Sequence, residues 1–298
     1  MVKLRLGIIG LSEGNGHPYS WSAIINGYDY SLMKDCGFPV IPEYLSKQDW
    51  PKDMIQNARI NSIWTQDIEL SNKISVTCNI RSVEDNFEAM IGKVDAILLA
   101  RDDSENHFYF AKKFLSAGLP IYIDKPIATN LSDLNKIYDL ETFQGQIFSC
   151  SATRYSYELK LSKKLYREIG SIKEINAYSP KSWEKYSVHI IEPVLSILGH
   201  DDALISSKLK KNREDKSVLL KLKWKSGVIT TFECTGTRES PIKIVINGTN
   251  GSKELVFSDT FSAFKVTLQT FIDNAINEEF KPSYELNKKI VSIIELGI

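Results

Sequence analysis

Short apolar runs rich in β-branched residues alternate with helical patterns over the first half of the chain. This alternation predicts βαβ units and a parallel sheet. We expect strands at residues 4–9, 60–64, 76–79, 96–100, 121–123 and 146–150. Helices are expected over 105–117, ending at Gly118, and over 132–140. The first half is therefore predicted to be an α/β domain on a doubly wound parallel sheet, over residues 1–150.

The period of the pattern changes after residue 150. A helix is expected over 157–169, followed by alternating strands at 218–224, 228–232, 242–246 and 254–257. Strands with one polar face are typical of an open, mostly antiparallel sheet. We therefore expect a second α/β domain over residues 151–298. Residues 28–57 fit neither pattern and are predicted to be an irregular insertion that forms a lid or an interface.

Composition narrows the class of protein. The 298 residues contain 37 Lys plus Arg and 37 Asp plus Glu, so the formal net charge is zero. A protein that binds nucleic acid or an anionic membrane is expected to be basic instead. No apolar run approaches membrane-spanning length and the amino terminus lacks a signal-peptide pattern, so we expect a cytoplasmic protein that binds small molecules. The four cysteines are widely separated, which favours neither a disulfide framework nor a metal site.

The loop after the first strand is rich in glycine and runs Gly10-Leu11-Ser12-Glu13-Gly14-Asn15-Gly16-His17-Pro18. Such glycines let backbone amides approach a pyrophosphate at a helix amino end, and Pro18 suits the first turn of that helix. The match to G-x-G-x-x-G is imperfect, so an ordinary turn is the alternative, and His17 suits a ligand contact or a structural role. The same letters spell the G-x-S-x-G elbow of hydrolases, with Ser12 as nucleophile.

Two acidic positions follow later strands. Asp67 is the candidate for the ribose hydroxyls of a dinucleotide, or else a helix cap, and the choice between NAD and NADP stays open. The strand at 121–123 delivers Asp124, Lys125 and Pro126 to the sheet edge, where open α/β sheets do chemistry. A lysine there can donate or accept a proton, whereas the alternative is a surface lysine in a turn.

His189 lies in an otherwise apolar segment, where a lone histidine is usually structural. Pro193 forbids an undisturbed helix, so we expect the helix to start near Glu192 or to kink. His200, after Gly199, is expected to cap a helix end.

Together these features resemble the Gfo/Idh/MocA family of NAD(P)-dependent oxidoreductases over nearly the whole chain. The resemblance implies an amino-terminal Rossmann domain, a carboxyl-terminal domain with an open antiparallel sheet, and catalytic roles for Lys125 and His189, which are expected to meet from separate domains. Matching motifs are Asp124-Lys125-Pro126, Ala100 to His107, Phe114 to Gly118, Arg154, Gly170-Ser171-Ile172, and His189 with Glu192.

The implied reaction is reversible hydride transfer between a nicotinamide and a secondary alcohol of a sugar, cyclitol or related polyol. Cofactor-binding candidates are Gly10, Ser12, Gly14, Asn15, Gly16, His17, Asp67, Arg101, Asp102 and Asp124. Substrate-binding candidates are Arg154, Lys185 and Tyr186. Lys185 stands where the family often has an aspartate, one helical turn before His189, which motivates a second hypothesis of a non-catalytic NAD(P)-binding regulator or scaffold.

A self-associating sheet in the second domain is also implied by the resemblance. We expect a homo-dimer or homo-tetramer, with the exposed face of residues 218–232 as its interface.

Overall fold

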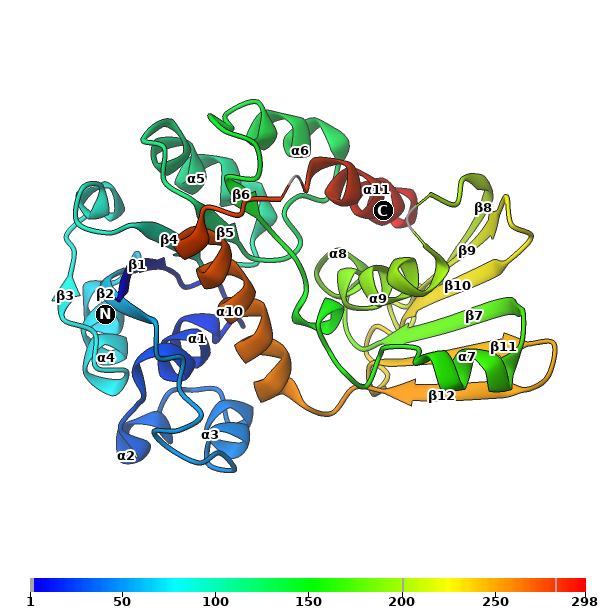
Figure 1. The fold of residues 1–298 in the computed structure, drawn as a ribbon, viewed down its shortest axis with the longest axis horizontal. Helices are drawn as coiled ribbons and strands as arrows, with labels where there is room; N and C mark the ends of the chain where they lie inside the picture. The colour runs from blue at the N-terminus through cyan, green and yellow to red at the C-terminus, as the bar shows by residue number, and fades with distance from the viewer. Residues whose placement is uncertain (1–2, 200, 282) are drawn as a thin grey trace. The chain divides into compact units, whose positions relative to one another are not determined.

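The computed structural model describes residues 3–199, 201–281 and 283–298, which form two compact units (Figure 1). His200, the expected helix cap, lies outside the described residues. The first unit runs to Ala128 and also holds Ser132–Ser149 and Phe264–Tyr284. The second unit holds Thr129–Leu131, Cys150–Ala263 and Glu285–Ile298. The chain therefore returns to the first unit after residue 263, within the range that the sequence analysis gives to the second domain.

A six-stranded parallel sheet forms the centre of the first unit, as predicted. Its strand order, β3-β2-β1-β4-β5-β6, is that of a Rossmann fold. The strands are β1 (Leu4–Ile9), β2 (Ala58–Trp64), β3 (Ser82–Val83), β4 (Ala96–Leu99), β5 (Ile121–Ile123) and β6 (Ile147–Phe148). Strands β4 and β5 are buried along their whole length, as expected where helices cover both faces. The strand order reverses between β1 and β4, and ligands of such sheets bind at the carboxyl ends around this point.

The helices of this unit are α1 (His17–Asn26), α2 (Tyr30–Met33), α3 (Val40–Leu45), α4 (Ile68–Thr77), α5 (His107–Ser116), α6 (Leu131–Tyr138) and most of α10 (Thr260–Asn277), with 3-10 turns η1 (Phe87–Met90) and η2 (Ser104–Asn106).

Helix α4 shows that the strand expected at 76–79 is wrong. The Asp67 carboxylate accepts a hydrogen bond from the Glu69 N–H at 2.9 Å and starts a helix that continues through Val76. This cap and the packing of the helix outweigh the β-propensity of its last residues.

The insertion at 28–57 is ordered rather than irregular. Helices α2 and α3 lie within it, and every residue of α1 from Pro18 to Ile25 is buried. A Cβ built on Gly16 would lie 2.6 Å from Ile41 Cδ1 and 2.8 Å from Phe38 Cγ, so the insertion packs tightly on the start of α1. An ion pair of 3.4 Å between Lys265 and Asp53 joins the insertion to α10.

A second six-stranded sheet forms the other unit, in the order β12-β11-β7-β10-β9-β8. Its strands are β7 (Ile172–Ser179), β8 (Leu204–Lys211), β9 (Val218–Trp224), β10 (Ile229–Cys234), β11 (Lys243–Gly248) and β12 (Ser252–Val256). Only the β7–β10 pair is parallel among these described strands, so the predicted mostly antiparallel sheet is confirmed. The sequence analysis gives no strand at β7 or β8, although it identifies the other four.

The helices of the second unit are α7 (Lys163–Ile169), α8 (Trp183–Tyr186), α9 (Val188–Leu198) and α11 (Tyr284–Gly297), with a 3-10 turn η3 (Ala152–Arg154). The helix expected over 157–169 covers only its last seven residues, because the Ser162 hydroxyl accepts the Leu165 N–H and caps α7.

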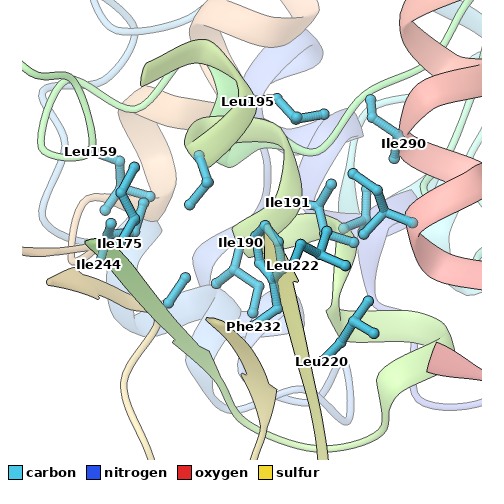
Figure 2. Packing of buried hydrophobic residues seen from close by; sticks show 14 of the residues in the cluster. Leu159, Ile175, Ile190, Ile191, Leu195, Leu220, Leu222, Phe232, Ile244 and Ile290 are labelled. Carbon is cyan, nitrogen blue, oxygen red and sulfur yellow. The ribbon is translucent and has the colours of Figure 1, made fainter. Parts of the chain in front are cut away.

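One face of this sheet carries the core of the unit. Ile190 and Ile191 of α9 lie among Leu222 of β9 and Phe232 of β10, and all four side chains are fully buried (Figure 2). Along β9 the buried residues alternate with exposed Lys221 and Lys223, which face the other side. The sheet therefore buries one face under helices and leaves the other open in the monomer.

Pro193 lies inside α9, which begins at Val188 rather than near Glu192. Proline has no N–H to donate to the carbonyl four residues earlier, here that of His189. The Thr153 hydroxyl donates to this carbonyl at 2.9 Å instead. The helix can therefore continue through the proline with the freed carbonyl satisfied.

Gly248 and Gly251, in the turn between β11 and β12, provide a matched test of this packing. A Cβ on Gly248 would lie 2.3 Å from the Ile169 carbonyl oxygen, whereas a Cβ on Gly251 would have no neighbour within 4 Å. We expect Gly248→Ala to lower the free energy of unfolding by about 2 kcal/mol through overpacking. Gly251→Ala is expected to stay within about 0.5 kcal/mol of the wild type. Equal effects in urea unfolding would contradict this account.

Candidate functional site

Three loops at the carboxyl ends of parallel strands meet around Asp124, which follows β5 and is fully buried. Its Oδ2 accepts a hydrogen bond from Asn15 Nδ2 at 2.9 Å and lies 2.5 Å from His17 Nδ1. Its Oδ1 accepts the Lys125 N–H at 2.7 Å. Asp124 therefore ties the glycine-rich loop after β1 to the strand end that carries Lys125.

The pKa of the Asp124 carboxyl results from opposing effects. Burial alone would raise it, but the charges of His17 and Lys125, with the hydrogen bonds from His17 and Asn15, outweigh burial and hold the pKa well below its usual value. Asp124 is therefore a carboxylate at neutral pH, and its partners compensate for the loss of water.

A second carboxylate links β4 to the same region. Asp102 Oδ1 accepts a hydrogen bond from the Ser12 hydroxyl at 2.8 Å, and the Asp102 N–H donates to Ser12 Oγ at 3.0 Å. Asp102 Oδ2 lies 3.6 Å from Lys125 Nζ, and both side chains are less than a tenth exposed. The Lys125 ammonium thus lies beside a carboxylate in a nearly dry environment and is not a surface lysine in a turn.

Gln66, which the sequence analysis missed, holds the start of the glycine-rich loop. Its Nε2 donates to the Leu11 carbonyl at 2.7 Å, and its Oε1 accepts the Leu11 N–H at 3.3 Å and Arg101 Nη1 at 3.0 Å. The only sequence signal was its place directly after the second strand, beside Asp67. Asp67 itself caps α4, which is the alternative left open for it above.

The Arg101 guanidinium is held by neighbouring side chains. Its guanidinium makes two hydrogen bonds to the Asp103 carboxylate, at 2.9 and 2.6 Å, and lies over the Phe110 ring. It lines the end of β4 as expected, with its charge already paired.

The three glycines of the loop have different surroundings. A Cβ on Gly10 would lie 2.3 Å from Pro18 Cγ, and Gly16 lies against the insertion, so these two glycines permit close contact with protein atoms. Gly14 has a φ of +76° and no atom within 4 Å of a built Cβ. Gly14 is therefore the position where the loop backbone is open to a phosphate group. Together with the strand order, this fits a dinucleotide held by the loop and the start of α1.

Aromatic stacking fixes the orientation of His17. The ring stacks on Trp21 at 5.0 Å between centroids, and Trp21 stacks in turn on Tyr122 of β5 at 4.7 Å. Phe264, at the start of the α10 segment in this unit, contacts the His17 ring edge at 5.1 Å. The pairing with Asp124 and the stacking on Trp21 thus give His17 a structural role, and its contact with a cofactor stays a prediction.

The Ser12 arrangement differs from that of a hydrolase. A serine nucleophile needs a base, usually a histidine, to accept its proton. The Ser12 hydroxyl bonds directly to Asp102, and the nearby His17 is paired with Asp124. The elbow motif thus lacks the geometry of a triad.

In the second unit, His189 belongs to a separate polar network. Its Nδ1 lies 2.7 Å from Ser151 Oγ, and its ring contacts that of Tyr186 at 5.3 Å between centroids. Glu192, one turn later, accepts the Ser151 N–H at 3.0 Å and Arg154 Nε at 2.8 Å. The structure therefore brings His189, Tyr186 and, through Glu192, Arg154 together on α9 and its neighbours.

Lys185 lies in α8, four residues before His189. Ser187, between α8 and α9, has helical dihedrals of −60° and −33°, so the helical path is nearly continuous. Residues four apart on a helix share a face. Lys185 and His189 therefore lie on the same face of this helical path.

Within the described ranges, no group of His, Cys, Asp or Glu could hold a metal ion, and no helix is long and apolar enough to cross a membrane.

Comparisons with known proteins agree with this geometry. Residues 44–151 match the family model described as "Oxidoreductase family, NAD-binding Rossmann fold". A search of curated proteins gives no match. Similar solved structures include myo-inositol dehydrogenase from Lactobacillus casei with NAD(H) and myo-inositol, at 17% identity over 100% of this chain and 92% of that one, TM-score 0.73.

Two further structures have the same fold. Myo-inositol 2-dehydrogenase from Lactobacillus plantarum is 14% identical over 99% of this chain and 95% of its own, with a TM-score of 0.72. UDP-N-acetylglucosamine 3-dehydrogenase from Acidithiobacillus ferrooxidans is 11% identical over 100% and 97%, with a TM-score of 0.69.

The burial of Asp124 can be tested by removing its charge. Asp124→Asn keeps the shape but removes the charge that His17 and the Lys125 N–H contact, so we expect the free energy of unfolding to fall by about 3 kcal/mol. Asp133→Asn is the control, because Asp133 pairs with Lys136 at 2.8 Å on the exposed surface. That change should cost less than about 0.5 kcal/mol in the same thermal unfolding experiment. A stable Asp124→Asn protein would refute the proposed balance.

Proposed function

Since residues 44–151 match the Gfo/Idh/MocA oxidoreductase family model, we propose that this protein transfers a hydride between a nicotinamide dinucleotide and a secondary alcohol or ketone of a sugar or cyclitol. The same match supports the predicted class, an oxidoreductase with an NAD-binding Rossmann fold. The choice of a polyol substrate is supported by the inositol and UDP-N-acetylglucosamine dehydrogenases that share the fold.

The observation that carries this proposal is the position of Lys125. It follows β5, is only 6% exposed, and lies beside Asp102 in the loop after β4. Asp124 fixes its backbone through the 2.7 Å hydrogen bond to the Lys125 N–H. A fixed, nearly dry ammonium at a strand end is suited to donate a proton to, or hold, a substrate oxygen.

The cofactor supplies the hydride chemistry when bound. Gly14 and the backbone around it would hold the pyrophosphate, while Gln66 and Arg101 keep the loop in place. As the alcohol becomes a ketone it loses its hydroxyl proton, and we assign acceptance of that proton to Lys125 or His189, with the other residue orienting the hydroxyl. Ser151 Oγ lies 2.7 Å from His189 Nδ1 and fixes the orientation of the ring. Arg154 and Tyr186 are the substrate-positioning residues of this proposal.

A second candidate function is that of a non-catalytic NAD(P)-binding regulator. It is favoured by Lys185, which replaces the acid expected near His189, and by the two loop glycines that contact protein atoms instead of open space. A regulator of this kind would bind the dinucleotide without any turnover of substrate.

The homo-oligomer stays a prediction for the open face of the second sheet. Every residue of the edge strand β8 is exposed in the monomer, including Leu204, Ile205 and Leu209. An edge and an open face of this kind are suited to a second copy of the chain.

Replacement of Lys125 separates the two candidate functions. For an enzyme, Lys125→Met should lower the rate of nicotinamide reduction on a polyol substrate by about 10²- to 10⁴-fold, because the proton acceptor or donor is lost. Cofactor affinity should be little changed. Lys113→Met, on the exposed side of α5, is the control and should keep full activity. Full turnover by Lys125→Met would refute the assignment, and cofactor binding without turnover by the wild type would favour the regulator.

Cofactor binding gives a test that needs no substrate. NAD or NADP at about 100 times its dissociation constant should stabilise the protein by about 2.7 kcal/mol, seen as a rise in melting temperature, and the tighter ligand identifies the preferred cofactor. Gln66→Leu removes both hydrogen bonds between the Gln66 side chain and the Leu11 backbone, so we expect the variant to bind the cofactor about tenfold more weakly. Gln56→Leu is the control, because its side chain bonds only to nearby carbonyls. Equal affinities of both variants would contradict the role of Gln66.

A further inference from the structure

The second unit contains a cavity of about 260 Å³ that the proposed reaction does not yet use. Its walls come from η3, the segment before α7, α7 itself and the later turns of α9. The residues that line it are Thr153, Arg154, Leu159, Lys160, Leu161, Tyr166, Pro193, Ser196 and Ile197. Sites for whole drug-sized ligands measure about 300–1,000 Å³, so this cavity suits one substituent of a larger molecule.

The polar side chains that line the cavity are cations and hydroxyl groups that can donate hydrogen bonds. Arg154 and Lys160 line it together with the hydroxyls of Tyr166 and Ser196, and no acidic side chain lines it. Glu192 neutralises the Arg154 charge through Nε, at 2.8 Å. Lys160 is exposed, and among the described residues no ion pair to its ammonium is found. The cavity therefore carries one net positive charge.

One donor of Arg154 is left over. Its Nη2 is buried and has no hydrogen-bond partner among the residues that the structure describes. A buried donor without a partner costs about 1–3 kcal/mol, and an anionic oxygen is the strongest acceptor that could remove this cost. The guanidinium is thus held by Glu192 on one side and unsatisfied on another.

The cavity also lies along the helix that carries His189. Pro193 and Ile197 follow His189 at intervals of four, which places them on the same face of α9. The Thr153 hydroxyl joins the two places, because it bonds to the His189 carbonyl and its residue lines the cavity. With a rise of 1.5 Å per residue, the cavity begins about 6 Å along the helix from His189, at Pro193, and extends to about 12 Å, at Ile197.

From these observations we propose that the cavity binds an oxyanion substituent, a carboxylate or a phosphate, of the substrate. Lys160 supplies the charge, and Arg154 Nη2, Tyr166 and Ser196 supply hydrogen bonds. The substrate is then an acidic or phosphorylated sugar or cyclitol, with the anionic group several ångströms from the reacting alcohol. This substrate class rests on the proposed function, whereas binding of the anion does not.

A binding experiment tests the cavity by itself. Inorganic phosphate is titrated into the intact protein by calorimetry at constant ionic strength, so that screening does not change. We expect Lys160→Ala to weaken binding about tenfold and Lys160→Arg to restore it. Lys164→Ala is the matched control, because Lys164 lies 3.9 Å from Glu168 on the exposed surface of α7 and does not line the cavity. No binding, or equal binding by the wild type and Lys160→Ala, would overturn the proposal.

A kinetic experiment separates this inference from the proposed function. With NAD or NADP, oxidation of D-glucuronate, D-glucose 6-phosphate and myo-inositol is compared, and the first two distinguish a carboxylate from a phosphate. We expect a preference for one anionic substrate, and about tenfold higher KM with unchanged kcat in Lys160→Ala. Turnover of myo-inositol alone, indifferent to Lys160, would refute the anion cavity and support the dehydrogenase. Phosphate binding through Lys160 without any turnover would support the cavity and oppose the dehydrogenase.

Discussion

A fully buried carboxylate constrains the arrangement of the whole dinucleotide-binding end of the first unit. Removing a carboxylate from water costs several kcal/mol, and Asp124 cannot be ionised there unless partners compensate it. Two of the partners, Asn15 and His17, come from the loop after β1, more than a hundred residues earlier. The loop must therefore carry an amide and an imidazole where other Rossmann loops need only to be small.

The periodic features of the fold could be predicted from the sequence, because local patterns determine them. Strands β1, β4 and β5 lie within one residue of their expected bounds, and the hairpin strands of the second sheet are close to theirs. The failures have non-local or capping causes. Asp67 caps helix α4, which includes Val76 of the expected strand. Ser162 caps α7, so this helix begins at Lys163 rather than at residue 157. The return of residues 264–284 to the first unit depends on contacts such as that of Phe271 with Tyr122, which no local pattern records.

The candidate site shows the same division. Lys125 and the open position at Gly14 could be identified from motif and strand position, since both depend on the end of a strand. Gln66 could not, because its function lies in two hydrogen bonds to the backbone of Leu11, 55 positions away. For His17 the sequence leaves a ligand contact and a structural role open, and its stacking on Trp21 and pairing with Asp124, which supply the structural role, come from residues that no local pattern places beside it.

Charge around α9 connects the most unusual sequence feature with the chemistry of the second unit. Lys185 lies four residues before His189 on the nearly continuous helical path through α8 and α9, so the two residues share a face of that path. Arg154 and Lys160 line a cavity beside α9, and no acidic side chain lines it. Glu192 already pairs with Arg154, so the anionic substituent proposed above would balance the charge of Lys160, and a change of substrate charge would account for the exchange of an aspartate for Lys185.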